Sequence, residues 1–269
     1  MSFAFGQARE LTLEQAGRLG HALRSQGRPV ALVCADSIHA GHLALIDAAA
    51  RLPRGITILA LTGTQDGPLP QVDAVVRVDP RDLYPAGPRT RLVPADHGLE
   101  DPAQLGEALT QLVALAAAVR ASDVVVGEKD YEFALAAQQA MTDLHQNVTV
   151  RSVPTVRMPG GLAVSHRNVA VPKNQREAAV ALSAALTAGA HVAERGYQAV
   201  LDTAAGVLAA AGVAPDYLEL RDRSLRRLDP QCQQADARLL VAATFGPVRL
   251  VDNVGVPLGV GFKNLGDAS

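Results

Sequence analysis

Three short segments of the sequence combine the residue types that bind and transfer phosphate groups. They are residues 39–42 (His-Ala-Gly-His), residues 127–130 (Gly-Glu-Lys-Asp) and residues 165–168 (Ser-His-Arg-Asn). Imidazole, ammonium and guanidinium groups stabilise the charge that builds on phosphoryl oxygens during a displacement at phosphorus. No Gly-x-x-x-x-Gly-Lys-Ser/Thr sequence occurs, so phosphate binding of the Walker type is excluded. The combination predicts a bound polyphosphate in a site of a different design.

The first segment lies where a buried strand is expected to end and a helix to begin. There His39 and His42 occupy neighbouring positions of one helical turn, and Gly41 lets a ligand approach the backbone closely. The N–H groups at a helix N-terminus also attract phosphate. In the alternative interpretation, both histidines are ordinary surface or core residues. A zinc site is not expected, because no third ligand of a suitable type lies nearby.

The second and third segments supply further cationic and polar groups. Lys129 follows another expected buried strand and is a candidate phosphate ligand, and Asp130 is a candidate acceptor for the hydroxyls of a ribose. In the alternative interpretation, Glu128 and Asp130 only cap a helix. Ser165 and Arg167 follow a glycine-rich loop that could close over a triphosphate, with the forked donors of arginine on its oxygens. A solvated turn is the alternative there.

The elements that must position these segments alternate between strand and helix. Short apolar runs predict strands at residues 29–35, 56–61, 73–78, 123–126 and 147–152, and helical patterns lie at 12–25, 41–52, 102–120 and 130–146. Apolar strands without alternation are typical of a parallel sheet covered on both faces. Such sheets bind ligands beyond the carboxyl ends of their strands.

A change of composition near residue 172 predicts a second domain. Residues 175–211 are rich in alanine and should form one or two helices, whereas 216–220, 238–243 and 248–251 resemble small antiparallel strands. We therefore expect an α/β fold with a Rossmann-like parallel-sheet domain at residues 1–172, followed by a smaller α+β domain at residues 173–269.

The composition argues against several classes of protein. A net charge of -2 and an aromatic content of 3% without tryptophan argue against nucleic-acid binding, and no apolar run is long enough to span a membrane. Cys34 and Cys232 are too few for a disulfide framework or a four-thiolate zinc site. The first residues lack the features of a signal peptide, so a cytoplasmic location is expected.

Taken together, these segments resemble the pantothenate synthetase (pantoate–β-alanine ligase) family. The resemblance includes His-x-Gly-His at 39–42, Gly-Glu-Lys-Asp-Tyr at 127–131 and the loop at 165–168. It continues through Pro-Thr-Val-Arg at 154–157, Asp-Tyr-Leu-Glu-Leu-Arg at 216–221 and Arg-Leu-Val-Asp-Asn at 249–253, in the family's order.

The resemblance implies an ATP- and Mg2+-dependent ligase. A carboxylate attacks the α-phosphorus of ATP to give an acyl adenylate, which an amine then converts to an amide with release of AMP. The phosphates would be bound by His39, His42, Lys129, Ser165 and Arg167. The rest of the nucleotide would be held by Gly41, Gly127, Asp130 and Val156. The resemblance further implies a nucleotidyltransferase-type first domain, a second domain that acts as a lid, small-molecule acid and amine substrates, and a homodimer.

Departures from the family pattern fall on the acid and amine pocket. Asp36 replaces a glycine before the first histidine, Thr62 replaces an asparagine while Gln65 is kept, and Phe133 replaces a glutamine. The segment after Gly67 is shorter than the family pattern. These changes leave two possibilities open, ligation of pantoate to β-alanine or of a different acid and amine. Asp36 is a candidate to orient a cationic amine, or else a cap for the helix that begins near residue 41.

Two other interpretations remain. Nucleotidyl transfer to a phosphorylated cofactor precursor uses the same kind of sheet and histidine motif, by analogy of fold. A catalytically silent paralogue that binds nucleotide is the second alternative, which the pocket changes favour and the retained Lys129, Ser165 and Arg167 oppose.

Overall fold

The structure is a computed structural model, and it describes residues 6–65 and 67–260. The chain divides into two compact units, Met1–Val156 and Arg157–Ser269. Each unit has its own sheet and its own apolar core.

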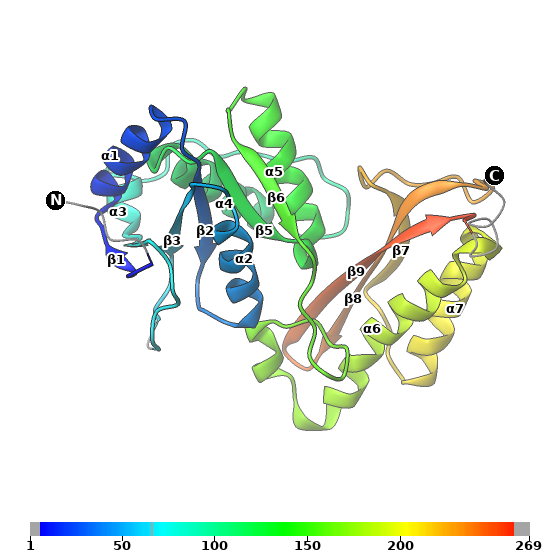
Figure 1. The fold of residues 1–269 in the computed structure, drawn as a ribbon. Helices are drawn as coiled ribbons and strands as arrows, with labels where there is room; N and C mark the ends of the chain where they lie inside the picture. The colour runs from blue at the N-terminus through cyan, green and yellow to red at the C-terminus, as the bar shows by residue number, and fades with distance from the viewer. Residues whose placement is uncertain (1–5, 66, 261–269) are drawn as a thin grey trace. The chain divides into compact units, whose positions relative to one another are not determined.

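The first unit is a six-stranded sheet in which every pairing is parallel (Figure 1). The strand order is β1-β4-β3-β2-β5-β6. The strands are β1 (Arg9–Glu10), β2 (Val30–Ala35), β3 (Ile56–Leu61), β4 (Ala74–Arg77), β5 (Asp123–Gly127) and β6 (Thr149–Val153). The helices are α1 (Leu13–Arg24), α2 (Ala40–Ala50), α3 (Pro80–Leu83), α4 (Pro102–Ala118) and α5 (Tyr131–Asp143).

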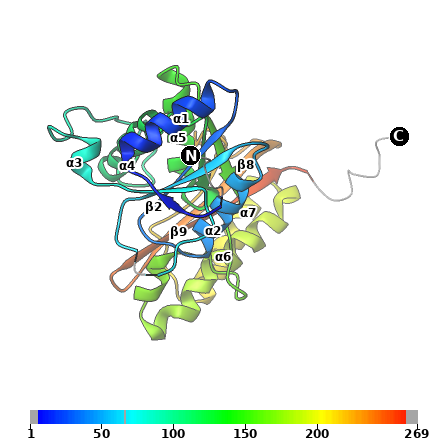
Figure 2. The ribbon, with the colours of Figure 1, turned by 60° about the vertical axis from the view of Figure 1, so that its left-hand side comes forward.

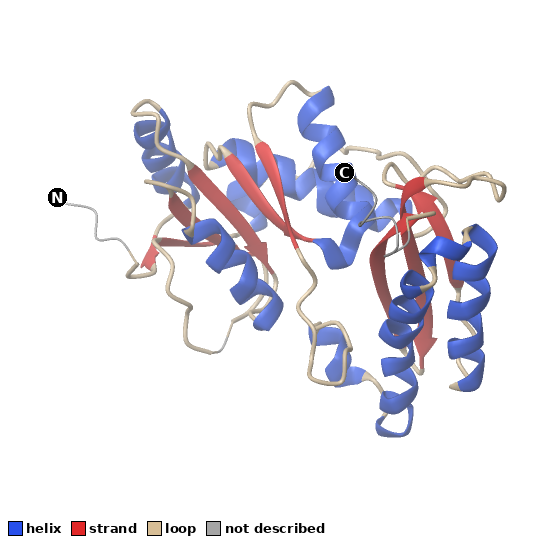
Figure 3. Cartoon of the chain, turned by 45° about the vertical axis from the view of Figure 1, so that its right-hand side comes forward, coloured by secondary structure: helices blue, strands red, loops and turns tan. Residues whose placement is uncertain are grey.

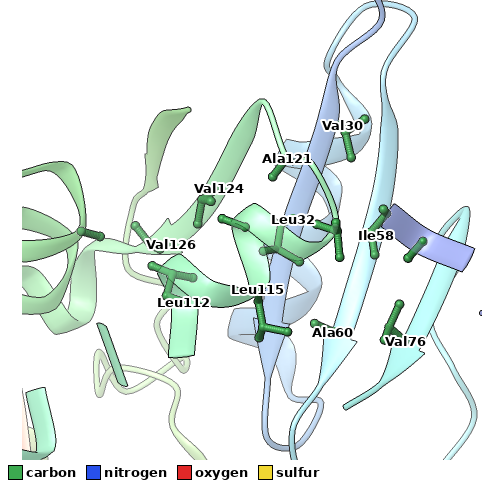
Figure 4. Packing of buried hydrophobic residues seen from close by; sticks show 14 of the residues in the cluster. Val30, Leu32, Ile58, Ala60, Val76, Leu112, Leu115, Ala121, Val124 and Val126 are labelled. Carbon is green, nitrogen blue, oxygen red and sulfur yellow. The ribbon is translucent and has the colours of Figure 1, made fainter. Parts of the chain in front are cut away.

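Apolar side chains on both faces explain why the central strands are buried. On one face, Leu32 and Ile58 pack with Leu115 of α4 in a cluster that also takes in residues of α1 and α5 (Figure 4). Those three helices lie on this side of the sheet (Figure 2). On the other face, Leu59 belongs to a second cluster with Ile46 of α2. Helices therefore cover both faces, as the apolar strands predict.

The strand order reverses once in this sheet. From β2 the chain moves outward through β3 to β4, and it then returns to place β5 on the other side of β2. The connections that leave the carboxyl ends of β2 and β5 consequently run in opposite directions, and open parallel sheets usually bind their ligands at such a reversal. The first two chemically important segments of the sequence lie at these two strand ends.

The second unit is a three-stranded antiparallel sheet with two helices on one face (Figure 3). Its elements are α6 (Arg176–His191), α7 (Tyr197–Ala210), β7 (Tyr217–Asp222), β8 (Ala235–Phe245) and β9 (Val248–Leu258). Leu182 and Leu186 of α6 pack against Leu239 and Val241 of β8 in the core of this unit. The alanine-rich segment thus forms two helices, and β8 and β9 form one long hairpin.

The predicted fold class is confirmed, but the two units meet at a different residue from the predicted one. The division between the units falls earlier than the predicted boundary at residue 172, because residues of that segment pack with the second unit. Arg157 forms a bidentate ion pair with Asp252 at 2.6 and 3.1 Å, and Val171 belongs to the second core. No helix in the described part of the chain combines the length and apolar character that crossing a bilayer requires.

We expect Gly20→Ala to lower the free energy of unfolding by about 1–3 kcal/mol, the usual cost of overpacking. A Cβ at Gly20 in α1 would lie 2.0 Å from the carbonyl oxygen of Val119, so the backbone must shift. Gly206→Ala in α7 is the control, because a Cβ there meets no atom within 4 Å and alanine favours helix by about 0.5–1 kcal/mol. Denaturant unfolding measures both, and effects of equal sign would contradict this packing.

Candidate active site

His39 ends the loop after β2 and caps helix α2. Its backbone is extended, with φ -139°, and its Nδ1 accepts a hydrogen bond from the backbone N–H of Gly41 at 3.0 Å. A side-chain acceptor at this position satisfies one of the N–H groups that a helix N-terminus leaves without an intrahelical partner. The same residue that could contact phosphate therefore also fixes where α2 begins.

This hydrogen bond also sets the tautomer of His39. Because Nδ1 accepts, the proton of the neutral ring lies on Nε2, which is then a donor. The ring of His42 lies against that of His39, with centroids 4.0 Å apart and planes inclined by 36°. The two histidines thus form one donor group at the start of α2.

The segment after β5 supplies the next group of the site. Strand β5 pairs with β2, and helix α2 contacts both strands, so the turn at residues 127–130 follows a strand adjacent to the one that precedes the histidines. Lys129 lies in a short 3-10 turn, Glu128–Asp130, with its side chain 15% exposed and its Nζ 3.4 Å from Oδ1 of Asp130. The Asp130 side chain is largely exposed. Sequence and topology thus bring the predicted phosphate and ribose ligands to adjacent strand ends.

Gly127 presents bare backbone at the end of β5. A Cβ built there meets no atom within 4 Å, and its φ of -86° suits any residue. Neither packing nor backbone conformation in the protein therefore requires glycine at this position. A ligand that lies against the backbone is a physical reason to keep it.

Three of the residues predicted to bind the acid and amine make hydrogen bonds in the loops after β2 and β3. The amide oxygen of Gln65 accepts from the N–H of Ile38 at 3.0 Å, which ties the loop after β3 to the loop before His39. The hydroxyl of Thr62 donates to the carbonyl oxygen of Ala35 at 3.3 Å. Asp36 is exposed and accepts from the N–H of Ser37 at 2.7 Å. The cap of α2 is His39 and not Asp36, so the alternative role considered for Asp36 is wrong.

The remaining predicted site residues are described here by their burial and contacts within the unit to which each belongs. Phe133 is partly buried and packs against the main core of the first unit. Val156 is half-buried at the end of that unit. In the second unit, the hydroxyl of Ser165 accepts from the N–H of Arg167 at 3.2 Å, while Arg167 is exposed. Gly41 lies in the first turn of α2, where its N–H is the donor to His39.

Glu132 is a buried carboxylate that the sequence does not reveal. It lies in the first turn of α5, is 5% exposed, and accepts from the backbone N–H of Glu100 at 3.0 Å. Burial and the nearby negative charges of Glu100 and Asp96 raise the pKa of this carboxyl above its usual value. Glutamate in a first helical turn is common on protein surfaces, so no pattern signals its burial. It attaches the loop before α4 to the helix that follows Lys129.

Cys34 does not provide a nucleophile. It lies near the end of β2 and packs against the core, and desolvation raises the pKa of its thiol to about 12. A thiol with such a pKa holds its proton at neutral pH. Within the described residues, no group of three or more His, Cys, Asp or Glu side chains gathers to hold a metal ion.

A cavity of about 510 Å³ lies at the carboxyl ends of β3 and β4. Its walls combine apolar and polar groups from the ends of both strands and the segments that follow them. They are Leu61, Gly63, Thr64, Gln65, Arg77, Val78, Asp79 and Pro80. Gln65 therefore belongs both to this cavity and to the hydrogen-bonded loop that leads to His39. The sequence signalled Gln65 but not Arg77.

Comparison with known proteins gives consistent matches. The family model described as pantoate-beta-alanine ligase matches residues 70–255. The pantothenate synthetase of Corynebacterium jeikeium (strain K411) is 42% identical over an alignment of 296 residues, which covers 99% of this chain and 96% of the relative. That of Mycolicibacterium paratuberculosis (strain ATCC BAA-968 / K-10) is 39% identical and covers 88% and 85%.

Solved structures of similarly named proteins also match this chain. Pantothenate synthetase from Thermus thermophilus matches with a TM-score of 0.77 and 27% identity, over 91% of this chain and 98% of that one. Pantoate-beta-alanine ligase from Francisella tularensis, solved with beta-gamma ATP and beta-alanine, matches at 0.69 and 19%, over 92% and 97%, which is a likeness of fold alone. The chain belongs to the pantoate–β-alanine ligase family.

Proposed function

We propose that this protein is an ATP-dependent, AMP-forming ligase that joins a carboxylic acid to an amine through an acyl adenylate. Pantoate and β-alanine are the substrates named in the description of the family model that the chain matches. One observation carries the proposal. The helix capped by His39 begins at the end of β2, and the Gly127–Asp130 turn follows the adjacent β5, on either side of the reversal in strand order. That is where a sheet of this kind binds a nucleotide.

The first step is a displacement at phosphorus. A carboxylate oxygen of the acid forms a bond to the α-phosphorus of ATP, and the bond to the bridging oxygen breaks, so pyrophosphate leaves with the electron pair. Negative charge spreads over the phosphoryl oxygens in the transition state. The Nε2–H of His39, the ring of His42 and the ammonium of Lys129 are the donors we assign to these oxygens, together with the N–H groups at the start of α2.

The second step forms the amide. The amine nitrogen attacks the carbonyl carbon of the acyl adenylate, and AMP leaves with the electron pair of the broken C–O bond while the nitrogen gives up a proton. The protein holds the adenylate in place and excludes water from the activated carbonyl. We assign Gly127, Asp130 and Val156 to the nucleoside, and Asp36, Thr62, Gln65 and Phe133 to the side that receives the acid and amine.

The second unit and the assembly complete the proposal. Ser165 and Arg167 are assigned to the phosphates, where a guanidinium can bind two oxygens at once. Mg2+ would enter with ATP as part of the substrate, since this ion is usually bound through phosphate oxygens and water. We further propose a homodimer in the cytoplasm, on the resemblance to the family.

The experiment that tests the function is the exchange of labelled pyrophosphate into ATP, which reports the first step only when the acid is present. We expect exchange with pantoate or a related acid, and amide formation when an amine is added. Lys129→Ala should reduce the exchange by about 100-fold or more, because it removes a charged donor from the transition state. Lys173→Ala, an exposed lysine of the second unit, is the control. Exchange that persists in Lys129→Ala would remove this residue from the mechanism.

His39→Asn separates the two roles of His39. Asparagine is a good N-cap, so the variant should keep the thermal stability of the parent, yet it lacks the Nε2–H donor and should lose about 10²–10³ in exchange rate. His39→Ala should lose the activity and also about 1 kcal/mol of stability, the usual value of a cap. If the asparagine variant kept full activity, His39 would serve only to cap α2.

Gly127→Ala should weaken ATP binding without harming the fold. The added methyl group meets no protein atom within 4 Å, so the melting temperature should not fall. It would occupy the space next to the backbone that we assign to the nucleoside, so KM for ATP should rise about 10-fold or more, a loss of about 1.4 kcal/mol in binding. Gly255→Ala, an exposed strand glycine that also has open space, is the control. An unchanged KM would place the nucleoside elsewhere.

A further inference from the structure

The turn that carries Lys129 leads into a helix that has no side-chain cap. Asp130 precedes α5, but its side chain gives no hydrogen bond to the N–H groups at the start of that helix. Its carboxylate lies instead 3.4 Å from Nζ of Lys129, and its backbone is neither helical nor extended, with φ -98° and ψ 66°. A helix start without a cap keeps N–H groups that lack intrahelical partners, and such ends fray. The position of Lys129 therefore needs support from outside the turn.

Glu132 gives such support from the first turn of α5. It is 5% exposed, and its Oε2 accepts from the backbone N–H of Glu100 at 3.0 Å, across thirty-two residues of sequence. The backbone N–H of His97 also stabilises the carboxylate. Hydrogen bonds of this kind offset part of the cost of removing a carboxylate from water.

Burial nevertheless raises the pKa of the Glu132 carboxyl above its usual value. The folded protein then binds this proton more tightly than the unfolded chain does, so stability falls as the pH rises past the usual pKa of glutamate. At neutral pH the ionised side chain costs stability. Stability is therefore not the physical reason to keep a carboxylate at this position.

The N–H groups that Glu132 binds belong to the end of a long loop that is fixed on α4. The loop spans residues 84–101, between α3 and α4. The N–H of Leu92 donates to the hydroxyl of Thr110 in α4 at 2.9 Å, and Asp101 caps the same helix. Helix α4 packs in the main core of the first unit. The carboxylate thus joins the start of α5 to a segment that is held independently of it.

Both helices begin at the edge of the sheet where the proposed site lies. Helix α5 follows the carboxyl end of β5, whereas α4 leads to the amino end of the same strand. A helix that leads into a parallel strand crosses back from the carboxyl edge, so α4 begins at that edge as well. The bond from Glu100 to Glu132 therefore lies between two helix starts, three residues along the chain from Lys129.

We infer that Glu132 is a positioning residue for Lys129. Its carboxylate oxygen, bonded to the end of the loop before α4, holds the first turn of α5 and with it the turn that presents the ammonium to the phosphates. The inference rests on the proposed function. In this role Glu132 touches no substrate and acts through Lys129. A misplacement of about 1 Å is enough to cost a catalytic group much of its effect on the transition state.

Two variants of similar size separate the oxygen acceptor from the packing of the side chain. Glu132→Gln keeps an oxygen that can accept from Glu100, whereas Glu132→Met has no such oxygen. The assay is pyrophosphate exchange with the full chain, ATP and pantoate, or the acid that supports exchange in its place.

We expect Glu132→Met to lower kcat about 10-fold and to change KM for ATP less than about 2-fold, because the ammonium acts mainly in the transition state. Glu132→Gln should stay within about 2-fold of the parent in kcat, since the bond to Glu100 is kept. Its melting temperature should not fall, because it removes a buried charge. Should Glu132→Met not fold, Glu132→Asp, whose carboxylate is one carbon too short to reach Glu100, is expected to show the same loss in kcat.

A double-mutant cycle tests whether the effect passes through Lys129. In the Lys129→Ala background, Glu132→Met should change the remaining exchange less than about 2-fold, since no ammonium is left to misplace. A merely structural role would lower exchange equally in both backgrounds. Glu177→Gln is the matched control, because Glu177 has the same position in the first turn of α6 but is exposed.

Amide hydrogen exchange gives a readout that does not depend on catalysis. Glu132→Met should lower the protection of the Glu100 N–H and of the turn at residues 128–130, and Glu132→Gln should not. Unchanged kcat in Glu132→Met, an equal loss in Glu132→Gln, or additive losses with Lys129→Ala would overturn the positioning role and leave the ligase. A parent protein that shows no pyrophosphate exchange with any acid would overturn the proposed function, and the positioning role with it.

Discussion

The structure depends on one constraint, the parallel direction of all six strands in the first sheet. Parallel strands place their carboxyl ends at a single edge, and each connection from that edge must cross back over a face of the sheet. Apolar residues on both sides of β2 and β3 make this arrangement stable, because helices bury both faces. The reversal of order at β2 and β5 lies at that edge, which is the usual ligand-binding position of an open parallel sheet.

The backbone of helix α2 makes the electrostatic potential at that edge favourable for an anion. A helix that begins at the end of a strand directs its N–H groups beyond that edge of the sheet, and its dipole favours an anion there. His39 adds to this by capping the helix through Nδ1, which leaves the Nε2–H as a donor. Lys129, from the adjacent strand end, brings a charge that is only 15% exposed. The site thus combines backbone and side-chain donors held by the packing of the sheet.

The edge of the sheet has two parts, one at the ends of β2 and β5 and the other at the ends of β3 and β4. Around β2 and β5 lie His39, His42 and Lys129, which carry the resemblance to the family, and also Asp36 and Phe133, which depart from its pattern. Around β3 and β4, Thr62 is bonded to the backbone of β2, no helix covers the crossover in its described residues, and an open cavity lies at the strand ends. The residues that we assign to the phosphates carry the resemblance to the family, whereas the departures from its pattern fall on residues that we assign to the acid and amine. Selectivity among acids depends on polar groups that a wrong substrate leaves without hydrogen bonds.

Local sequence patterns determined the helices, most strands, the fold class and the histidine and lysine segments, because apolar periodicity and strand-to-helix junctions are short-range properties. Several features needed the tertiary structure. The burial of Glu132 depends on a loop thirty-two residues away, the cap of α2 by His39 was not distinguishable from one by Asp36, and the two-residue strand β1 has no apolar pattern of its own. A residue's type records what it can do chemically, whereas its neighbours from distant segments decide its burial, its partners and its access to a ligand.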